Sequence, residues 1–149
     1  MKKMLMTLAV AAFGLMSVNA VAQEENPNAP VLEFEQNVID YGTIDQDSDG
    51  NRFFKFTNTG EEPLIISNVR GSCGCTVPDR SVVNKPFAPG QSGELRVKYD
   101  THRLGRFQKR VTVTSNASQG TINLTIKGVV QQAQTTPVNE NQESSRVSR

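Results

Sequence analysis

The sequence predicts an all-β fold, and three observations lead to it. Apolar and polar residues alternate with a period of two through most of the middle of the chain, which is typical of strands with one buried and one solvated face. Turn-forming residues separate these runs, as at Asp49-Gly50, Pro89-Gly90 and Asn116–Gly120. No stretch of ten residues has helical periodicity. About seven short strands in roughly 100 residues predict an immunoglobulin-like antiparallel β-sandwich.

The strands are expected between residues 31 and 127. In order, they cover Val31–Phe34, Val38–Ile44, Arg52–Asn58, Leu64–Arg70, a short Cys75–Pro78, Glu94–Tyr99, Phe107–Thr114 and Thr121–Lys127. In the strand 94–99, for example, Leu95, Val97 and Tyr99 form an apolar face, and the residues between them form a charged one. Such two-faced strands favour antiparallel pairing, with one side of each sheet against a core.

Residues 1–22 are predicted to be a secretory signal peptide. Two lysines precede an apolar run, Leu5–Val18, which is shorter than the roughly 20 residues of a spanning helix. Small residues end the segment, so cleavage is expected between Ala22 and Gln23. We therefore expect a periplasmic or secreted protein with no membrane span after cleavage, and an uncut anchor is the alternative. An oxidising compartment would also permit a disulfide.

The exported chain divides into three parts. Residues 23–30 form a polar leader, and residues 31–130 form a single immunoglobulin-like domain. Residues 131–149 are rich in Gln, Asn, Ser and Thr and contain no aromatic residue. They cannot bury enough apolar surface to offset the entropy of ordering them, so this tail is predicted to be disordered.

The composition excludes several classes of function. With 16 Lys and Arg against 15 Asp and Glu, the net charge is +1, which argues against binding nucleic acid. Two cysteines cannot form a zinc ribbon, and one histidine cannot complete a multi-histidine metal site. The sequence has no nucleophile elbow, no Ser-His-Asp order and no phosphate loop. We therefore predict a protein that is not an enzyme, with a thiol-redox role as the one exception.

The most unusual stretch is Gly71–Thr76, with the sequence GSCGCT. It belongs to a longer segment, Phe56–Pro78, which reads FTNTGEEPLIISNVRGSCGCTVP, and FAPGQSGELRVKYD and FQKRVTVTSN follow it. With the DYGTI element at 40–44, this text resembles the bacterial family catalogued as domain of unknown function 1573, over about residues 31–130. The resemblance implies an exported immunoglobulin-like sandwich akin to domains of cilia, pilus chaperones and sperm proteins. It implies no established activity.

Cys73 and Cys75 admit several interpretations. In an extended chain their side chains share one face with Cα atoms near 6 to 7 Å apart, and Gly74 lets the backbone bend to close a disulfide. The pair is then a structural disulfide, two half-buried thiols without chemistry, a thiol-exchange site, or a Cu(I) site. Sandwich topology brings His102 near the pair as a third copper ligand. The alternative is that His102 is a solvated loop residue.

A second candidate metal site is the DQDSDG sequence at 45–50. Asp45, Asp47 and Asp49 match the opening of a calcium-binding loop. The twelfth position, which should be a bidentate Glu, is Phe56. The alternative is a polar hairpin turn closed by Asp49-Gly50.

These observations predict a non-enzymatic binding or scaffolding module of the cell envelope. Sandwiches of this kind have exposed edge strands and end loops, which suit an unknown protein partner that binds by strand addition. The alternative function is a thiol-redox or Cu(I)-binding protein that uses Cys73-Gly74-Cys75. We therefore expect no cofactor, with copper or calcium as the alternatives for which the sequence offers candidate ligands.

Overall fold

A computed structural model describes residues 26–134 of the chain. The predicted signal peptide, the bond between Ala22 and Gln23 and residues 135–149 of the predicted tail lie outside the described residues. Within the described part, no helix is long and apolar enough to cross a membrane.

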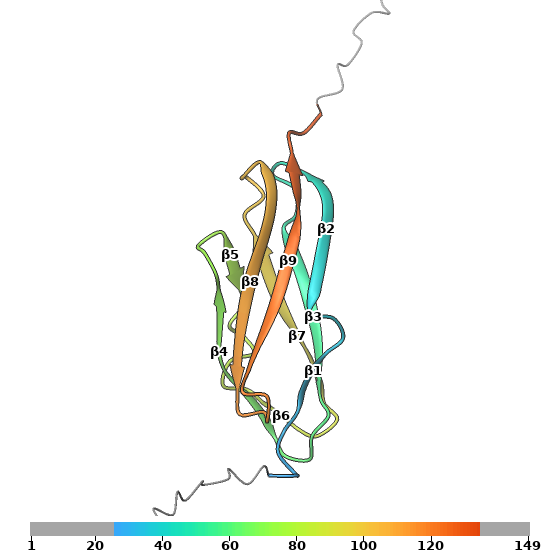
Figure 1. Ribbon diagram of the computed structural model, residues 1–149, viewed down its shortest axis with the longest axis vertical. Coiled ribbons are helices and arrows are strands. Elements are labelled where there is room, and N and C mark those ends of the chain that lie inside the picture. Colours follow the sequence, from blue (N-terminus) through green and yellow to red (C-terminus); the bar gives the residue numbers. More distant parts are fainter. Residues whose placement is uncertain (1–25, 135–149) are drawn as a thin grey trace, which may run out of the picture.

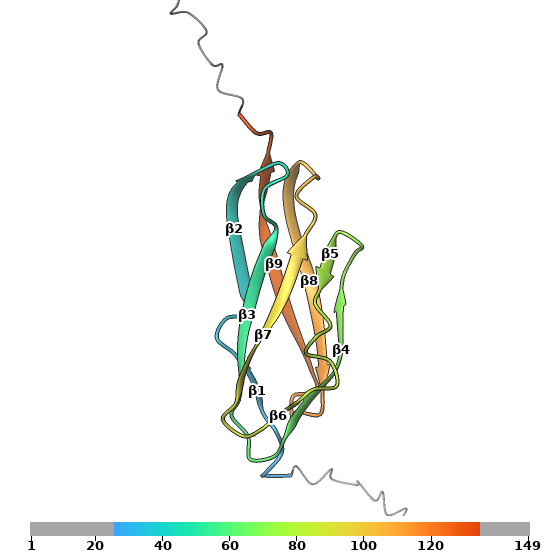
Figure 2. The ribbon, with the colours of Figure 1, turned by 180° about the vertical axis from the view of Figure 1, so that it is seen from behind.

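Two sheets pack face to face, which confirms the predicted β-sandwich (Figures 1 and 2). The strands are β1 (Leu32–Phe34), β2 (Val38–Asp45), β3 (Asn51–Asn58), β4 (Leu64–Gly71), β5 (Thr76–Pro78), β6 (Pro86–Phe87), β7 (Ser92–Tyr99), β8 (Gly105–Ser115) and β9 (Thr121–Gln131). The four-stranded sheet has the order β1-β3-β7-β5, and the five-stranded sheet has the order β2-β9-β8-β4-β6.

The prediction of purely antiparallel pairing is wrong at one edge, where β2 runs parallel to β9. The chain changes sheets between Phe34 and Val38, so that β1 pairs with β3 in one sheet and β2 pairs with β9 in the other. The second strand, β2, thereby becomes the neighbour of the last strand, β9. Alternation along each strand reports which face is buried, but it carries no information about the direction of a neighbour.

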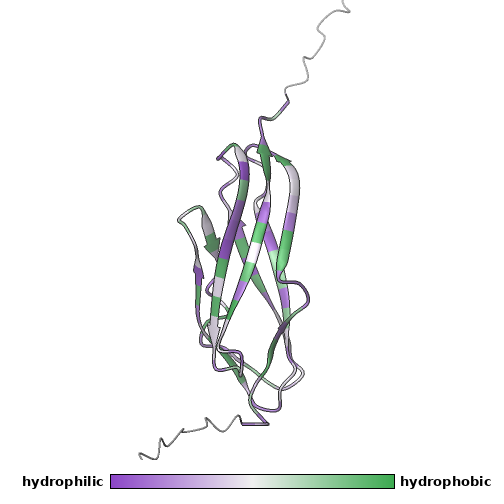
Figure 3. Ribbon diagram, viewed as in Figure 1, coloured by the Kyte–Doolittle hydropathy of each residue, from purple (hydrophilic) through white to green (hydrophobic). Residues whose placement is uncertain are grey.

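The core lies between the two sheets, and hydrophobic and hydrophilic residues alternate along the strands that enclose it (Figure 3). In β7 the side chains of Leu95, Val97 and Tyr99 are buried, as the alternation predicts. Tyr99 stacks on Phe107 of β8 with 3.7 Å between ring centroids, and the ring of Tyr41 meets Phe107 edge-on. These three rings join β7, β8 and β2 across the sandwich.

Asn58 is a fully buried polar residue at the end of β3. Its Nδ2 donates to the carbonyl oxygens of Glu62 (2.8 Å) and Phe87 (3.0 Å). Its Oδ1 accepts from the amides of Val31 and Gly60 at 3.3 and 3.1 Å. One side chain therefore satisfies backbone groups from three separate segments, namely the residue before β1, the loop between β3 and β4, and strand β6, which explains a polar residue in this core position.

The ends of the domain differ from the expected boundaries. Part of the predicted leader is ordered, because Pro30 is buried and its carbonyl oxygen accepts from the amide of Ser118 at 2.9 Å. At the other end, Gln131 is the last residue of β9 rather than the first of a loose tail, and its side chain donates to the Asp45 carboxylate at 2.9 Å. Pairing with β2 thus extends the last strand past the predicted boundary.

Candidate functional site

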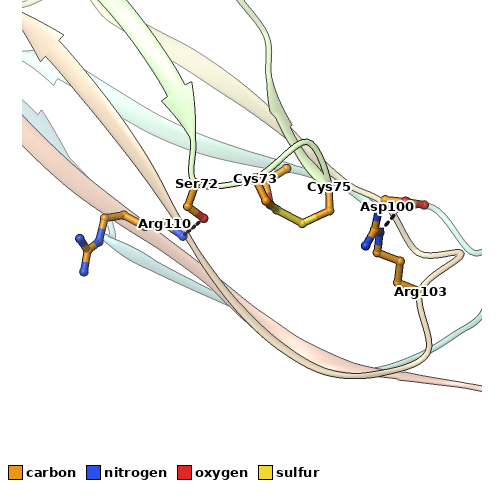
Figure 4. Close-up of a disulfide and its surroundings, with 7 residues drawn as sticks. Ser72, Cys73, Cys75, Asp100, Arg103 and Arg110 are labelled. Atoms are coloured by element: carbon orange, nitrogen blue, oxygen red, sulfur yellow. Dashed lines mark hydrogen bonds and ion pairs between the residues drawn. A yellow bond between two sulfur atoms is a disulfide. The ribbon is translucent and has the colours of Figure 1, made fainter.

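The GSCGCT segment forms the connection that carries the chain from β4 in one sheet to β5 in the other. Cys73 and Cys75 form a disulfide within this connection, with their Cα atoms 5.2 Å apart (Figure 4). The Cα distance is shorter than expected for an extended chain, because the amide of Thr76 donates to the carbonyl of Cys73 at 3.2 Å and closes a turn. Cys75 consequently lies in the turn, and β5 begins one residue later than predicted.

Backbone hydrogen bonds hold the disulfide turn from both sheets. On the β8 side, the Ser72 amide donates to the carbonyl of Arg110 at 2.9 Å, and the Arg110 amide donates to Ser72 Oγ at 3.2 Å. On the β7 side, the Asp100 amide donates to the carbonyl of Cys75 at 2.9 Å. The position of the turn is therefore fixed by contacts that do not involve the sulfur atoms.

The two sulfur atoms have different surroundings. Cys75 is 5% exposed and belongs to the core, whereas Cys73 is partly exposed at its margin. The Thr76 hydroxyl lies beside the disulfide bond, with Oγ1 3.7 Å from Sγ of Cys73 and 3.8 Å from Sγ of Cys75. Thr76 itself is 2% exposed. Sequence reasoning placed Thr76 in the motif but gave it no role, because its position beside both sulfurs depends on the turn.

His102, the predicted third copper ligand, pairs with an acidic side chain of another loop. Nδ1 of His102 is 2.8 Å from Oδ1 of Asp47, and the side chain of His102 is 78% exposed. This hydrogen bond and the charge of Asp47 raise the pKa of His102 above its ordinary value. The loop that contains His102 does lie beside both the 45–50 segment and the disulfide turn, since the Thr101 hydroxyl donates to the carbonyl of Ser48 at 2.7 Å and the Asp100 amide donates to the carbonyl of Cys75 at 2.9 Å. His102, however, is the solvated loop residue of the alternative interpretation.

The three predicted calcium ligands each have a different partner. Asp45 accepts from Gln131, Asp47 pairs with His102, and Asp49 accepts from the backbone and side-chain nitrogens of Asn51 at 3.0 and 2.7 Å. Across residues 26–134, no group of three or more His, Cys, Asp and Glu side chains is placed to hold a metal ion. The structure thus brings neither predicted ligand set together, and both sites stay predictions. The alternative of a hairpin turn is wrong, because β2 and β3 lie in different sheets.

The edge strands differ in what they offer a partner. Backbone N–H and C=O groups of successive residues in a strand point to opposite sides. In β5 those of Val77 therefore point toward β7, and those of Thr76 and Pro78 point outward. Proline has no N–H, and the Thr76 amide already donates to Cys73. The outer side of β5 therefore has no N–H for an added strand. β1 has three residues, and its Leu32 amide donates to the Gln119 side chain, while β6 has two residues and begins with a proline.

β2 is the long edge strand, with eight residues. The Asn37 carbonyl accepts from the Thr125 amide at 2.8 Å, and this ladder turns the backbone groups of Val38 and Asp40 away from β9. The Val38 side chain is 48% exposed. A bulge at Gly42, which has φ +65°, interrupts the ladder, and the Asp40 carboxylate caps it by accepting from the Gly42 amide at 2.8 Å. Sequence reasoning predicted exposed edges but could not single out this one.

Comparison with known proteins places the chain in a family without an assigned function. Residues 32–130 match the family described as "Protein of unknown function (DUF1573)", and the chain belongs to it. This confirms the resemblance seen in the sequence. No curated protein matches the chain.

Solved structures with the same fold come from distant proteins. One is the ASH / PapD-like domain 7 of human CEP192, with a TM-score of 0.60, 9% identity and coverage of 89% of this chain and all of that one. A protein of unknown function from Porphyromonas gingivalis W83 has a TM-score of 0.59 and 20% identity, over 74% of this chain and 51% of that one. The secreted serine protease VesC of Vibrio cholerae has a TM-score of 0.51 and 14% identity, over 67% of this chain and 23% of the VesC chain. These likenesses establish the immunoglobulin-like, PapD-like fold.

Proposed function

We propose that this chain is a non-enzymatic, exported binding or scaffolding module of the cell envelope. In this proposal the β2 edge accepts an extended segment of a partner protein. The observation that carries it is the difference between the edges: β5, β1 and β6 are short and have few N–H groups to offer, whereas β2 directs the backbone groups of Val38 and Asp40 outward. Main-chain hydrogen bonds to an added strand supply affinity in this mode of binding.

Side chains beside β2 add a means of selecting the partner. The exposed Val38 gives an added strand an apolar contact. A hollow next to the bulge is lined by Asp40, Thr43, Arg106 and Lys127, so polar and charged side chains of the partner have groups to meet there. Lys127 Nζ lies 3.4 Å from the Asp40 carboxylate, so these two lining residues form an ion pair within the hollow. Backbone pairing would supply affinity, and these side chains would supply specificity.

The binding proposal is tested by site-specific photo-crosslinking in the native host. A photoreactive residue replaces Thr43 on β2, or, as the matched control, Thr112 at the centre of the five-stranded sheet. We expect a discrete protein adduct at position 43 and none at position 112. Adding Val38→Pro, which removes an outward N–H, should abolish the adduct, and Val38→Ala should retain it. Equal adducts at both positions, or no effect of the proline, would contradict binding at this edge.

Export is part of the same proposal. It is supported by the charged start, the short apolar run and the small residues before Gln23. N-terminal sequencing of the protein from the periplasmic fraction or the medium should find a chain that begins at Gln23. A chain that retains Met1 in the membrane fraction would instead indicate an uncut anchor.

The alternative function is chemistry at Cys73 and Cys75. For Cu(I), two thiolates are needed, and in the disulfide form neither sulfur is a thiolate. A copper site is therefore a proposal for the reduced protein only. It predicts that reduced protein binds one Cu(I) and that the Cys73→Ser, Cys75→Ser double variant, with its fold intact, binds none.

A further inference from the structure

The hydrogen bonds that attach the disulfide turn to the two sheets do not depend on its sulfur–sulfur bond. The Ser72–Arg110 and Cys75–Asp100 hydrogen bonds attach the turn to β8 and β7, and the Thr76 amide holds the turn closed. None of these bonds involves a sulfur atom. Two thiols produced by reduction would consequently stay close together, ready to close again. A disulfide with this property is suited to repeated exchange.

The turn also distinguishes its two sulfurs. Cys73 is partly exposed, so an incoming thiolate meets this residue first, whereas Cys75 is buried. The Thr76 hydroxyl, within 3.8 Å of both sulfurs, is placed to donate a hydrogen bond to whichever sulfur becomes a thiolate. A hydrogen bond to the departing thiolate favours its departure. These positions are consistent with one order of events: a thiolate attacks Cys73, and Cys75 then leaves with a hydrogen bond from Thr76.

We infer that Cys73–Cys75 is an exchangeable disulfide that oxidises dithiols. A substrate thiolate attacks Sγ of Cys73, the bond between the two cysteines breaks, and Cys75 leaves as a thiolate that takes up a proton from solvent. The second substrate thiolate then attacks the substrate sulfur of the mixed disulfide, and Cys73 leaves as a thiolate that also takes up a proton from solvent. The substrate loses two electrons and gains a disulfide, while the protein gains two electrons and two thiols. Cys73 is the exchanging residue, and Thr76 is a positioning residue.

The substrate class is a flexible dithiol, and the geometry favours one within an unfolded polypeptide. Val77, two residues past Cys75, is 58% exposed, and Phe53 on the same outer face of the four-stranded sheet is 49% exposed. Lys98 of β7 pairs with Val77 of β5 on one side and with Asn51 of β3 on the other. A polypeptide dithiol bound at the disulfide would therefore have Val77 as an apolar contact next to it, and Phe53 as a second one two strands away on the same face.

The first experiment asks whether the bond opens in the folded protein. The full exported chain is equilibrated in glutathione buffers of increasing reducing strength, quenched with acid, alkylated and weighed by mass spectrometry, and circular dichroism is recorded in parallel. We expect reversible reduction with an unchanged β-sheet spectrum. If the bond resists reduction until denaturant unfolds the chain, the disulfide is structural and the inference fails.

The second experiment tests the asymmetry with single-cysteine variants. Cys75→Ser retains the partly exposed thiol, and Cys73→Ser retains the buried one. We expect Cys75→Ser to form a mixed disulfide with glutathione disulfide at least tenfold faster. In the Cys75→Ser background, Thr76→Val should slow this reaction several-fold, and Thr76→Ser should restore the rate. Because Val has nearly the shape of Thr but no hydroxyl, a Thr76 that acted only through packing would not give this result. Equal rates for the two cysteines would overturn the proposed order.

The third experiment identifies the substrate. Oxidised protein is mixed with reduced dithiothreitol or with a reduced, unstructured peptide that contains two cysteines. We expect one dithiol oxidised per chain in both reactions and a faster reaction with the peptide. Phe53→Ser and Val77→Ser should lower only the rate with the peptide. Equal rates would assign a small dithiol as the substrate in place of a polypeptide, and no oxidation of either would contradict the exchange itself.

Discussion

The amide of Asp100, directly after β7, donates a hydrogen bond to the carbonyl oxygen of Cys75 across 2.9 Å. This bond continues the β5–β7 ladder one residue beyond Thr76 and Tyr99. Ser72 does the same for the β4–β8 ladder on the other side of the turn. The disulfide thus lies between two ladder ends that belong to different sheets, and the ladders rather than the sulfurs determine where it sits.

Reduction of the disulfide should cost little stability. Its loop is only three residues long, and closing so short a loop removes about 1.5 kcal/mol of unfolded-state entropy at most. We expect urea unfolding of oxidised and reduced protein to differ by about 1.5 kcal/mol or less, with the same dependence on urea. A loss of several kcal/mol would show instead that the sulfurs hold the crossover together.

The two glycines of the motif should respond differently to alanine. A Cβ at Gly71 would overlap the backbone carbonyl of Thr76, so β4 and β5 would have to separate. We expect Gly71→Ala to lower the free energy of unfolding by about 1–3 kcal/mol. Gly74 faces open space, and Gly74→Ala should change the free energy by less than about 0.5 kcal/mol. Urea unfolding of both variants compares them directly, and equal effects would contradict this packing.

Asn58 should be the polar side chain whose loss costs most. Asn58→Ala would leave the carbonyls of Glu62 and Phe87 and the amides of Val31 and Gly60 without their partner in a buried site. We expect a loss of about 2–4 kcal/mol, from the cost of unsatisfied buried groups. Asn68→Ala, an exposed asparagine on β4, is the matched control and should change stability by less than about 0.5 kcal/mol. Thermal unfolding of the two variants tests this.

The alternation of apolar and polar residues predicted the strands well, because every second residue of a strand faces the core and is therefore apolar. It placed Leu95, Val97 and Tyr99 in the core, as the structure confirms. It could not predict the parallel pairing of β2, because a strand that changes sheets has the same pattern as one that does not. It also missed β6, since two residues that begin with Pro86 are too short to show a period.

The candidate site was less predictable than the fold. The spacing of Cys73 and Cys75 brought a disulfide into consideration, because their side chains share one face and Gly74 lets the backbone bend to bring them together. The distance estimate assumed an extended chain, and the turn through Gly74 shortened it to 5.2 Å. His102 was placed in the correct half of the sandwich, but its nearest acidic partner, Asp47, depends on loop conformation and not on strand order.

The Asp47–His102 pair should be visible as a raised histidine pKa. The hydrogen bond that the imidazolium donates to Asp47, the charge of Asp47 and the charge of Asp100 favour the charged form, so the pKa of His102 lies above the ordinary 6.5. His102 is the single histidine, and its ring protons can be followed by NMR without assignment. We expect the midpoint to fall toward 6.5 in Asp47→Asn and to stay unchanged in Asp45→Asn, whose carboxylate bonds to Gln131.

The same pair fixes the sign of a pH effect on stability. A histidine with a raised folded-state pKa contributes stability that is fully present below its unfolded pKa of about 6.5 and is lost as the pH rises through the folded pKa. The effect is small because both side chains are well exposed, 78% and 66%, and solvent screens them. Thermal unfolding at pH 5.5 and pH 8 should therefore separate wild type from Asp47→Asn more at the lower pH. A larger separation at the higher pH would mean that Asp47 acts through a contact other than His102.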